Sequence, residues 1–157
     1  MIKYYTGDIL ESDVNIICQQ VNHQGVMGSG LAKQIKNKYP DVMTNYLNLC
    51  KIDFEKLRRN GTISWCTVDT NKYIASIFGQ EYYGTDRTHT DLFALASGLE
   101  TVRQYAETRG FSVGIPHGIG CGLAGGDWSI VSAIIRDVFR YSPELDIRIY
   151  KLPLDRI

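Results

Sequence analysis

The stretch from residue 14 to residue 33, VNIICQQVNHQGVMGSGLAK, decides the fold. Its first eight residues form a largely apolar run without strict alternation, which is typical of a strand covered on both faces. Gly25, Gly28 and Gly30 follow directly, and a helical spacing of apolar residues begins after them. A buried strand that turns through glycines into a helix predicts an α/β sheet.

The rest of the chain repeats this pattern of short apolar runs and longer helical periods. Strands are predicted at residues 2–6, 14–21, 63–68, 73–78, 113–116 and 147–152. Helices are predicted at about 31–39 and 41–49, from 92 up to Gly110, and from Asp127-Trp128 to before Ser142. We therefore expect one α/β domain over residues 1–157, a three-layer α/β/α sandwich with a mixed central sheet and a ligand at the carboxyl ends of its strands.

Composition excludes several classes of protein. With 44% apolar and 22% charged residues, the chain is not expected to be disordered. Seventeen Lys plus Arg balance seventeen Asp plus Glu, so no bulk positive field attracts duplex nucleic acid or a membrane. The first residues lack the apolar core of a signal peptide, and no run approaches the ~20 apolar residues that span a bilayer. A cytoplasmic protein that binds anions by local geometry is expected.

Four cysteines are present, and their spacing argues against a disulfide scaffold or a metal site. Cys18, Cys50, Cys66 and Cys121 are far apart, without a CxxC pair or a histidine at metal-finger spacing. We therefore expect no metal and no cofactor.

Two glycine-rich segments follow predicted strands and open predicted helices. The first glycine segment is residues 22–33 (NHQGVMGSGLAK), and the second is residues 114–126 (GIPHGIGCGLAGG). Backbone N–H groups at such junctions can bind an anion, and two junctions on one small sheet can close on a diphosphate from opposite sides. Each segment alone could be a flexible turn, and neither has the spacing of a Rossmann fingerprint or a P-loop.

Asp8 lies at the end of the first predicted strand. Its carboxylate can accept a hydrogen bond from an adenine amino group, which would complete the recognition of a nucleotide. The alternative is an aspartate that only caps a turn, as Gly-Asp sequences commonly do.

Taken together, these motifs resemble the macrodomain family over nearly the whole chain. The resemblance is carried by Gly7-Asp8-Ile9, Val21-Asn22, 27–32 (MGSGLA), 38–40 (KYP), 119–123 (IGCGL) and 149–152 (IYKL). It is strongest to the branch of ADP-ribose-1''-phosphate processing proteins and hydrolases that remove ADP-ribose from glutamate or from DNA. The resemblance implies ADP-ribose, or a derivative of it, as the ligand.

The resemblance also implies which residues bind that ligand. Asp8, Ile9 and Leu152 would hold the adenine, and Asn22 would contact the distal ribose. The two glycine segments would wrap the diphosphate and distal ribose through Gly28, Gly30, Leu31, Ile119, Gly120, Cys121, Gly122 and Leu123.

One departure from the family concerns the chemistry at the distal ribose. The glutamate- and DNA-directed hydrolases carry a lysine after the strand that matches residues 73–78, and Gln80 stands at about that position here. A glutamine cannot form a Schiff base. The candidate catalytic residues are then Asn22, His23 and Asp127, with His117 weaker; Asp127 equally fits a helix N-cap. Cys121 lacks a recognisable His–Asp pair and is not expected to be a nucleophile.

Two functions remain open at this point. The chain is expected to hydrolyse a bond at C1'' of the distal ribose, with ADP-ribose-1''-phosphate as first substrate and ADP-ribosylated protein as second. The alternative is a module that binds ADP-ribose without turnover, which the missing lysine favours.

Overall fold

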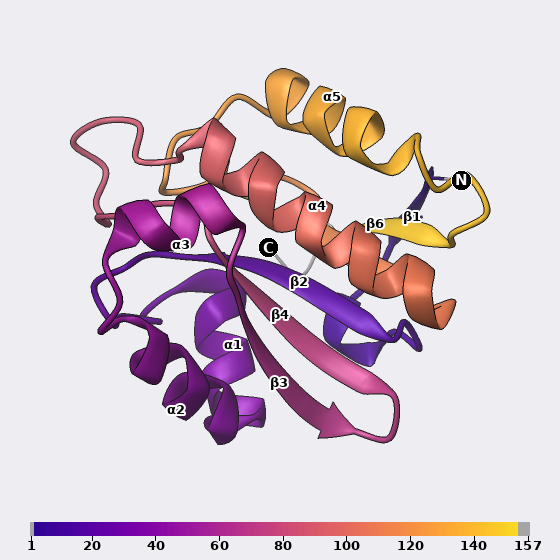
Figure 1. Ribbon diagram of the computed structural model, residues 1–157, viewed down its shortest axis with the longest axis horizontal. Helices are drawn as coiled ribbons and strands as arrows, with labels where there is room; N and C mark the ends of the chain where they lie inside the picture. The colour runs from indigo at the N-terminus through magenta and orange to yellow at the C-terminus, as the bar shows by residue number, and fades with distance from the viewer. Residues whose placement is uncertain (1, 154–157) are drawn as a thin grey trace.

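The computed structural model describes residues 2–153 as a six-stranded sheet with helices on both faces (Figure 1). The strands are β1 (Ile2–Thr6), β2 (Ile16–Val21), β3 (Ile63–Asp69), β4 (Lys72–Phe78), β5 (Val113–Pro116) and β6 (Ile147–Lys151). The α-helices are α1 (Gly30–Lys38), α2 (Pro40–Leu49), α3 (Phe54–Asn60), α4 (Leu92–Arg109) and α5 (Trp128–Phe139). A short 3-10 helix, η1, covers Ile9–Glu11.

The sheet is mixed, as predicted, in the order β1-β6-β5-β2-β4-β3. Five strands are parallel, and β3 at one edge is antiparallel to β4. The neighbouring strands β5, β2 and β4 therefore end side by side in the middle of the strand order. Ligands of parallel α/β sheets bind at these carboxyl ends.

Two apolar cores lie on opposite faces of the sheet. In Figure 1, α4 and α5 cover one face, while α1 and α2 lie on the other. In β2, Ile16 and Cys18 belong to the first core and Ile17 and Val21 to the second, so this strand is buried on both sides. Successive side chains of a strand point to opposite faces, so Gln19 and Gln20 leave β2 on different sides of the sheet.

The predicted elements are confirmed with small changes at their ends. Gly110 ends α4 in the left-handed conformation with φ 69°, and Pro40 is the first residue of α2. Helix α3 and η1 were not predicted, because seven and three residues are too short to show a helical period. No helix within residues 2–153 is long and apolar enough to cross a membrane.

Candidate functional site

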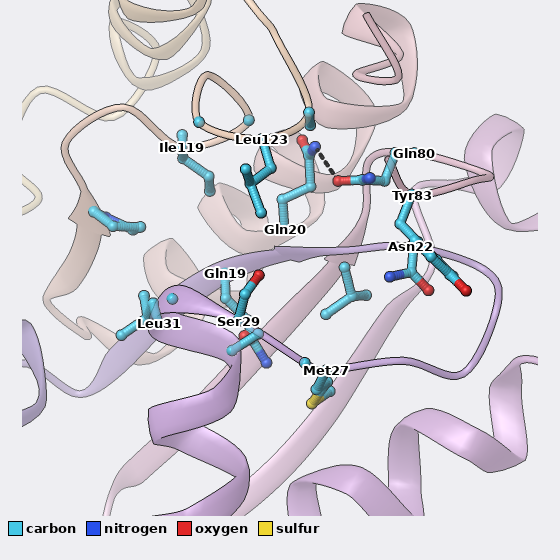
Figure 2. Close-up of a pocket in the computed structure, with 18 of the residues that line it drawn as sticks. Gln19, Gln20, Asn22, Met27, Ser29, Leu31, Gln80, Tyr83, Ile119 and Leu123 are labelled. Carbon is cyan, nitrogen blue, oxygen red and sulfur yellow. Dashed lines mark hydrogen bonds between the residues drawn. The ribbon is translucent and has the colours of Figure 1, made fainter. Parts of the chain in front are cut away.

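A cavity of about 690 Å³ opens at the carboxyl edge of β2, β4 and β5. Figure 2 shows Ile119 and Leu123 of the second glycine segment on one side, and Met27, Ser29 and Leu31 of the first on the other. The two segments, far apart in the chain, thus face each other across one space, as the sequence predicted. The volume lies within the range of small-molecule sites in proteins.

The lining of the cavity is mostly apolar, with a few polar side chains, and His117 is its one titratable group with a cationic form among the described residues. Among the lining residues of the described chain there is no Lys, Arg, Asp or Glu. Burial, followed by the nearby Lys151, lowers the pKa of His117, which keeps its ring neutral at pH 7. An anionic ligand would therefore be held by dipoles and N–H groups rather than by cationic side chains.

Asn22 anchors the first glycine segment directly after β2. Its side chain is 8% exposed; Nδ2 donates to the carbonyl oxygen of Val26 at 2.9 Å, and Oδ1 accepts from the N–H of Gln24 at 2.9 Å. Tyr46 of α2 donates its hydroxyl to Asn22 and accepts from the N–H of Gly25 at 3.0 Å. Hydrogen bonds of two side chains, Asn22 and Tyr46, therefore hold the first glycine segment in place.

The second glycine segment is held mainly by its own main chain and by residues 88–90. The N–H groups of His89 and Thr90 both donate to the carbonyl oxygen of Ala124, at 2.8 Å and 3.3 Å. The hydroxyl of Thr90 donates to the carbonyl oxygen of Gly120 at 2.5 Å. Gly120 has φ +74°, a left-handed conformation that favours glycine.

Gln20 connects β2 to the opposite wall of the cavity. Its Nε2 donates to Oε1 of Gln80 at 2.9 Å, drawn as the dashed line in Figure 2, and to the hydroxyl of Thr90 at 3.0 Å. The Gln20 carboxamide fills the space where a Cβ at Gly79 or at Gly120 would lie. The two glycines thus make room for this carboxamide, and Gln80 is fixed by it.

Several backbone N–H groups at the cavity have no acceptor among residues 2–153. In the first turn of α1, these are the N–H groups of Gly30, Leu31 and Ala32. The N–H groups of Gly120 and Gly122 in the second segment are likewise unpaired within residues 2–153. Ser29, the N-cap residue of α1, makes no side-chain capping bond. Donors at a helix N-terminus and in a glycine loop suit an anion such as a phosphate.

The structure brings most of the predicted binding residues to this cavity. The predicted residues that line it are Asn22, Gly28, Gly30, Leu31, Ile119, Gly120, Gly122 and Leu123. Asp8, Ile9, Cys121 and Leu152 do not line it. Asp8 caps η1 by accepting from the N–H of Leu10 at 2.9 Å, and Ile9 is buried. Binding of adenine by Asp8, Ile9 and Leu152 stays a prediction.

Two of the three predicted catalytic residues lie outside the lining of the cavity. Nε2 of His23 is 2.6 Å from the carbonyl oxygen of Ile52, and its ring packs against Phe54 and Phe78. Asp127 caps α5 by accepting from the N–H and the hydroxyl of Ser129. The alternative that Asp127 is an N-cap is therefore confirmed, and only Asn22 of the three lines the cavity.

Burial raises the pKa of the Cys121 thiol, and its Sγ donates to the carbonyl oxygen of Ile119 at 3.4 Å. A protonated thiol is a poor nucleophile, which agrees with the sequence prediction for this residue. Within residues 2–153, no group of three or more His, Cys, Asp or Glu side chains could hold a metal ion.

Four residues at or next to the cavity were not predicted from the sequence: Gln19, Gln20, Tyr46 and Thr90. Gln19 and Gln20 interrupt an otherwise apolar buried strand just before the first glycine segment, and this was the available signal. Thr90 and Tyr46 lie within unremarkable surroundings in the sequence. Only the tertiary structure brings them to the glycine segments.

Comparisons with known proteins agree with this geometry. No family model matches the chain. DNA ADP-ribosyl glycohydrolase of Mycobacterium tuberculosis is 30% identical over 151 residues, which are 96% of this chain and 42% of that protein. The chain thus spans about two fifths of the length of the curated relatives that it matches.

Solved structures give the same result for the fold. The macrodomain of Mycobacterium tuberculosis DarG superimposes with a TM-score of 0.80 and 29% identity, over 96% of this chain and 97% of that one. Thermosipho africanus DarTG in complex with ADP-ribose superimposes with a TM-score of 0.75 and 24% identity, over 96% of this chain and 42% of that one. The sheet order, the paired glycine segments and the match along almost the whole of a solved macrodomain identify this chain as a macrodomain.

Proposed function

We propose that this macrodomain binds ADP-ribose in the cavity between its two glycine segments. The observation that carries the proposal is that both segments line one neutral cavity and contain main-chain N–H groups that have no acceptor within residues 2–153. Thermosipho africanus DarTG, which has the same fold, is known in complex with ADP-ribose. The diphosphate would lie between the first turn of α1 and the second segment, with no cationic side chain required.

Because the lining has no cationic side chain, the cavity should favour ligands that contact both glycine segments over simple anions. Without Lys or Arg in the cavity, the affinity for the diphosphate depends on directed N–H donors, which are fixed by the two segments. Simple anions such as inorganic phosphate fill one donor cluster only and should bind far more weakly. The nucleoside and the distal ribose then supply further contact area.

We propose further that the domain hydrolyses a bond at C1'' of the bound distal ribose. The name of its relative, a DNA ADP-ribosyl glycohydrolase 30% identical to this chain, supports this activity. ADP-ribose-1''-phosphate is the first substrate to test, because the loss of phosphate does not need the lysine that Gln80 replaces, and ADP-ribosylated protein is the second. The second candidate function, binding without turnover, is favoured by Gln80, and by the fact that neither His23 nor Asp127 lines the cavity.

Calorimetry with ADP-ribose tests the binding. We expect a Kd of about 1–100 μM, or roughly −8 to −5.5 kcal/mol, with inorganic phosphate and ribose 5-phosphate as controls that bind much more weakly. A folded chain that shows no heat of binding with ADP-ribose contradicts the proposal.

A product assay separates hydrolysis from binding alone. The chain is incubated with ADP-ribose-1''-phosphate and, separately, with ADP-ribosylated protein or DNA, and free ADP-ribose is measured by chromatography. Release of ADP-ribose that falls at least tenfold in Asn22→Ala supports catalysis at this cavity. Binding of ADP-ribose without release from any of these substrates assigns the second candidate function.

A further inference from the structure

The hydroxyl of Tyr46 lies beneath the first glycine segment, where it contacts three groups of that segment. Its oxygen is 2.7 Å from the carbonyl oxygen of Asn22 and 2.8 Å from Oδ1 of Asn22. It also accepts the N–H of Gly25 at 3.0 Å. One phenol proton is thus shared by two acceptors of Asn22, and one phenol lone pair is taken by Gly25.

The position of this phenol is itself well determined. Tyr46 is fully buried, and its ring stacks on Phe78 with centroids 5.6 Å apart. Burial raises the pKa of Tyr46 well above its ordinary value, so the hydroxyl stays protonated and remains a donor at neutral pH. The helix that carries it, α2, also places Leu47 against Gly25, where an added Cβ would be 3.1 Å from Cδ2 of Leu47.

These contacts determine which end of the Asn22 carboxamide a ligand can meet. Oδ1 accepts from Tyr46 and from the N–H of Gln24, with the N–H of Val26 at 3.5 Å, so its acceptor capacity is used within the protein. Nδ2 carries two N–H groups and uses one of them on the carbonyl oxygen of Val26. In Figure 2 the amide nitrogen of Asn22 points toward the middle of the lining residues and the oxygen points away.

We propose that Tyr46 is a positioning residue of the ligand site, which fixes the Asn22 carboxamide so that it offers the ligand a hydrogen-bond donor and never an acceptor. The inference rests on the proposed function, because it takes ADP-ribose as the ligand. According to this proposal, Nδ2 of Asn22 donates a hydrogen bond to an acceptor of the ligand, such as a ribose hydroxyl oxygen, a ring oxygen or a phosphate oxygen. A ligand group that can only donate would be rejected at this point of the cavity.

Tyr46→Phe tests the positioning role, because it removes the hydroxyl and keeps the ring on Phe78. We expect the affinity for ADP-ribose, measured by calorimetry well below the melting temperature, to fall about tenfold or more. Tyr105→Phe, which removes a phenol hydroxyl from α4 on the other face of the sheet, is the matched control and should bind like the unmodified chain. Equal affinities of Tyr46→Phe and the control overturn the proposal.

A double-mutant cycle distinguishes positioning from a general loss of stability. If Tyr46 acts through Asn22, Tyr46→Phe should weaken binding less than twofold in an Asn22→Ala background. A tenfold effect that persists in this background means that Tyr46 acts independently of Asn22, which contradicts the proposal.

Asn22→Asp tests the donor assignment. The carboxylate places an acceptor where Nδ2 now donates to Val26 and faces the ligand, so we expect binding at least tenfold weaker than in Asn22→Ala. Binding by Asn22→Asp that equals or exceeds that of Asn22→Ala would mean that the ligand offers a donor here, and the assignment would be wrong.

One measurement does not depend on the ligand. Hydrogen exchange of the Gly25 amide in the free protein should be about tenfold faster or more in Tyr46→Phe than in Tyr105→Phe, because its acceptor is lost. If the unmodified chain binds no ADP-ribose, the proposed function fails, while the exchange rate still decides whether Tyr46 holds this segment. Unchanged exchange at Gly25 contradicts the positioning role.

Discussion

The two glycine segments line the same cavity, but they are held in different ways. Side chains hold the first one, since Asn22 and Tyr46 make most of its hydrogen bonds. The second is held mainly by main-chain bonds, within the segment and to residues 89–90. Both contain glycines with positive φ, so both should be sensitive to added side-chain atoms at those positions, but the first should be more sensitive than the second to the removal of side-chain atoms.

The largest effect is expected from Gly120→Val in the second segment. The new Cβ would be 2.9 Å from Oε1 of Gln20 and 3.2 Å from the hydroxyl of Thr90, and a β-branched residue would be forced to φ +74°. Backbone strain and overpacking each cost about 1–3 kcal/mol. We expect loss of ADP-ribose binding by more than a hundredfold in calorimetry, together with a lower free energy of unfolding.

Gly122→Ala is the matched control for this substitution. Nothing lies within 4 Å of its added Cβ, and Gly122 does not have a positive φ. Its stability should equal that of the unmodified chain. If Gly120→Val is folded and binds ADP-ribose with normal affinity, the second segment does not contact the ligand and the comparison between the segments loses its basis.

Asn22→Ala should have the next largest effect, in the first segment. It leaves the N–H of Gln24 without its acceptor and takes from the Tyr46 hydroxyl one of its two acceptors, which costs about 1–3 kcal/mol of folding free energy for buried groups. The affinity for ADP-ribose should fall roughly ten- to a hundredfold. Chemical denaturation and calorimetry measure the two quantities separately, and a variant with unchanged values of both would show that side chains do not hold this segment.

Thr90→Val should have a smaller effect, although it removes a side-chain contact from the second segment. The substitution is nearly isosteric. It takes from the Gly120 carbonyl oxygen one of two donors, since the N–H of Gly126 remains, and from Gln20 one of two acceptors. The main-chain bonds of His89 and Thr90 to Ala124 remain. We expect a loss of about 1 kcal/mol in stability and a few-fold loss in affinity. An effect as large as that of Asn22→Ala would contradict the contrast between the segments.

The smallest effect is expected on the melting temperature, from removing the N-cap carboxylate of Asp127 at the start of α5, the helix that follows the second segment. Hydrogen bonds from the Ser129 side chain and main chain lower the pKa of Asp127 from 3.8, whereas Ser29 makes no capping bond at the start of α1. Because the folded-state pKa is lowered, the carboxylate stabilises the protein above pH 4, and this contribution is lost as the pH falls through the lowered value. Melting temperatures of the chain and of Asp127→Asn should therefore differ slightly at pH 7 and converge below pH 4. A difference that grows on acidification would contradict this assignment.

Much of the fold follows from local sequence. Residues 92–109 and 128–139 carry apolar periods long enough to define α4 and α5, and the apolar character of β2 and β4 indicates burial on both faces. Helix α3 has only seven residues, and Arg58 in it donates to Asp91 at the start of α4. That contact joins residues 33 positions apart, and no local pattern shows it.

The candidate site was predictable where the main chain forms it. Glycines at strand-to-helix junctions are visible in the sequence, and both segments line the cavity. The side chains that hold them were not predictable, because Tyr46 and Thr90 reach the segments only through tertiary packing. Similarly, His23 follows Asn22 in sequence, but its ring turns to Phe54 and the carbonyl oxygen of Ile52.

Side chains of β2 alternate between the two faces of the sheet, and this alternation limits the insertions and deletions that the strand can tolerate. Gln19 donates to Ser76 under one face of the sheet, and Gln20 donates to Gln80 and Thr90 on the other. An insertion or deletion of one codon within this strand would exchange these faces, separate both amides from their present hydrogen-bond partners and move Asn22 out of register. Length variation in this lineage should therefore accumulate in the turns between strands and be absent from β2.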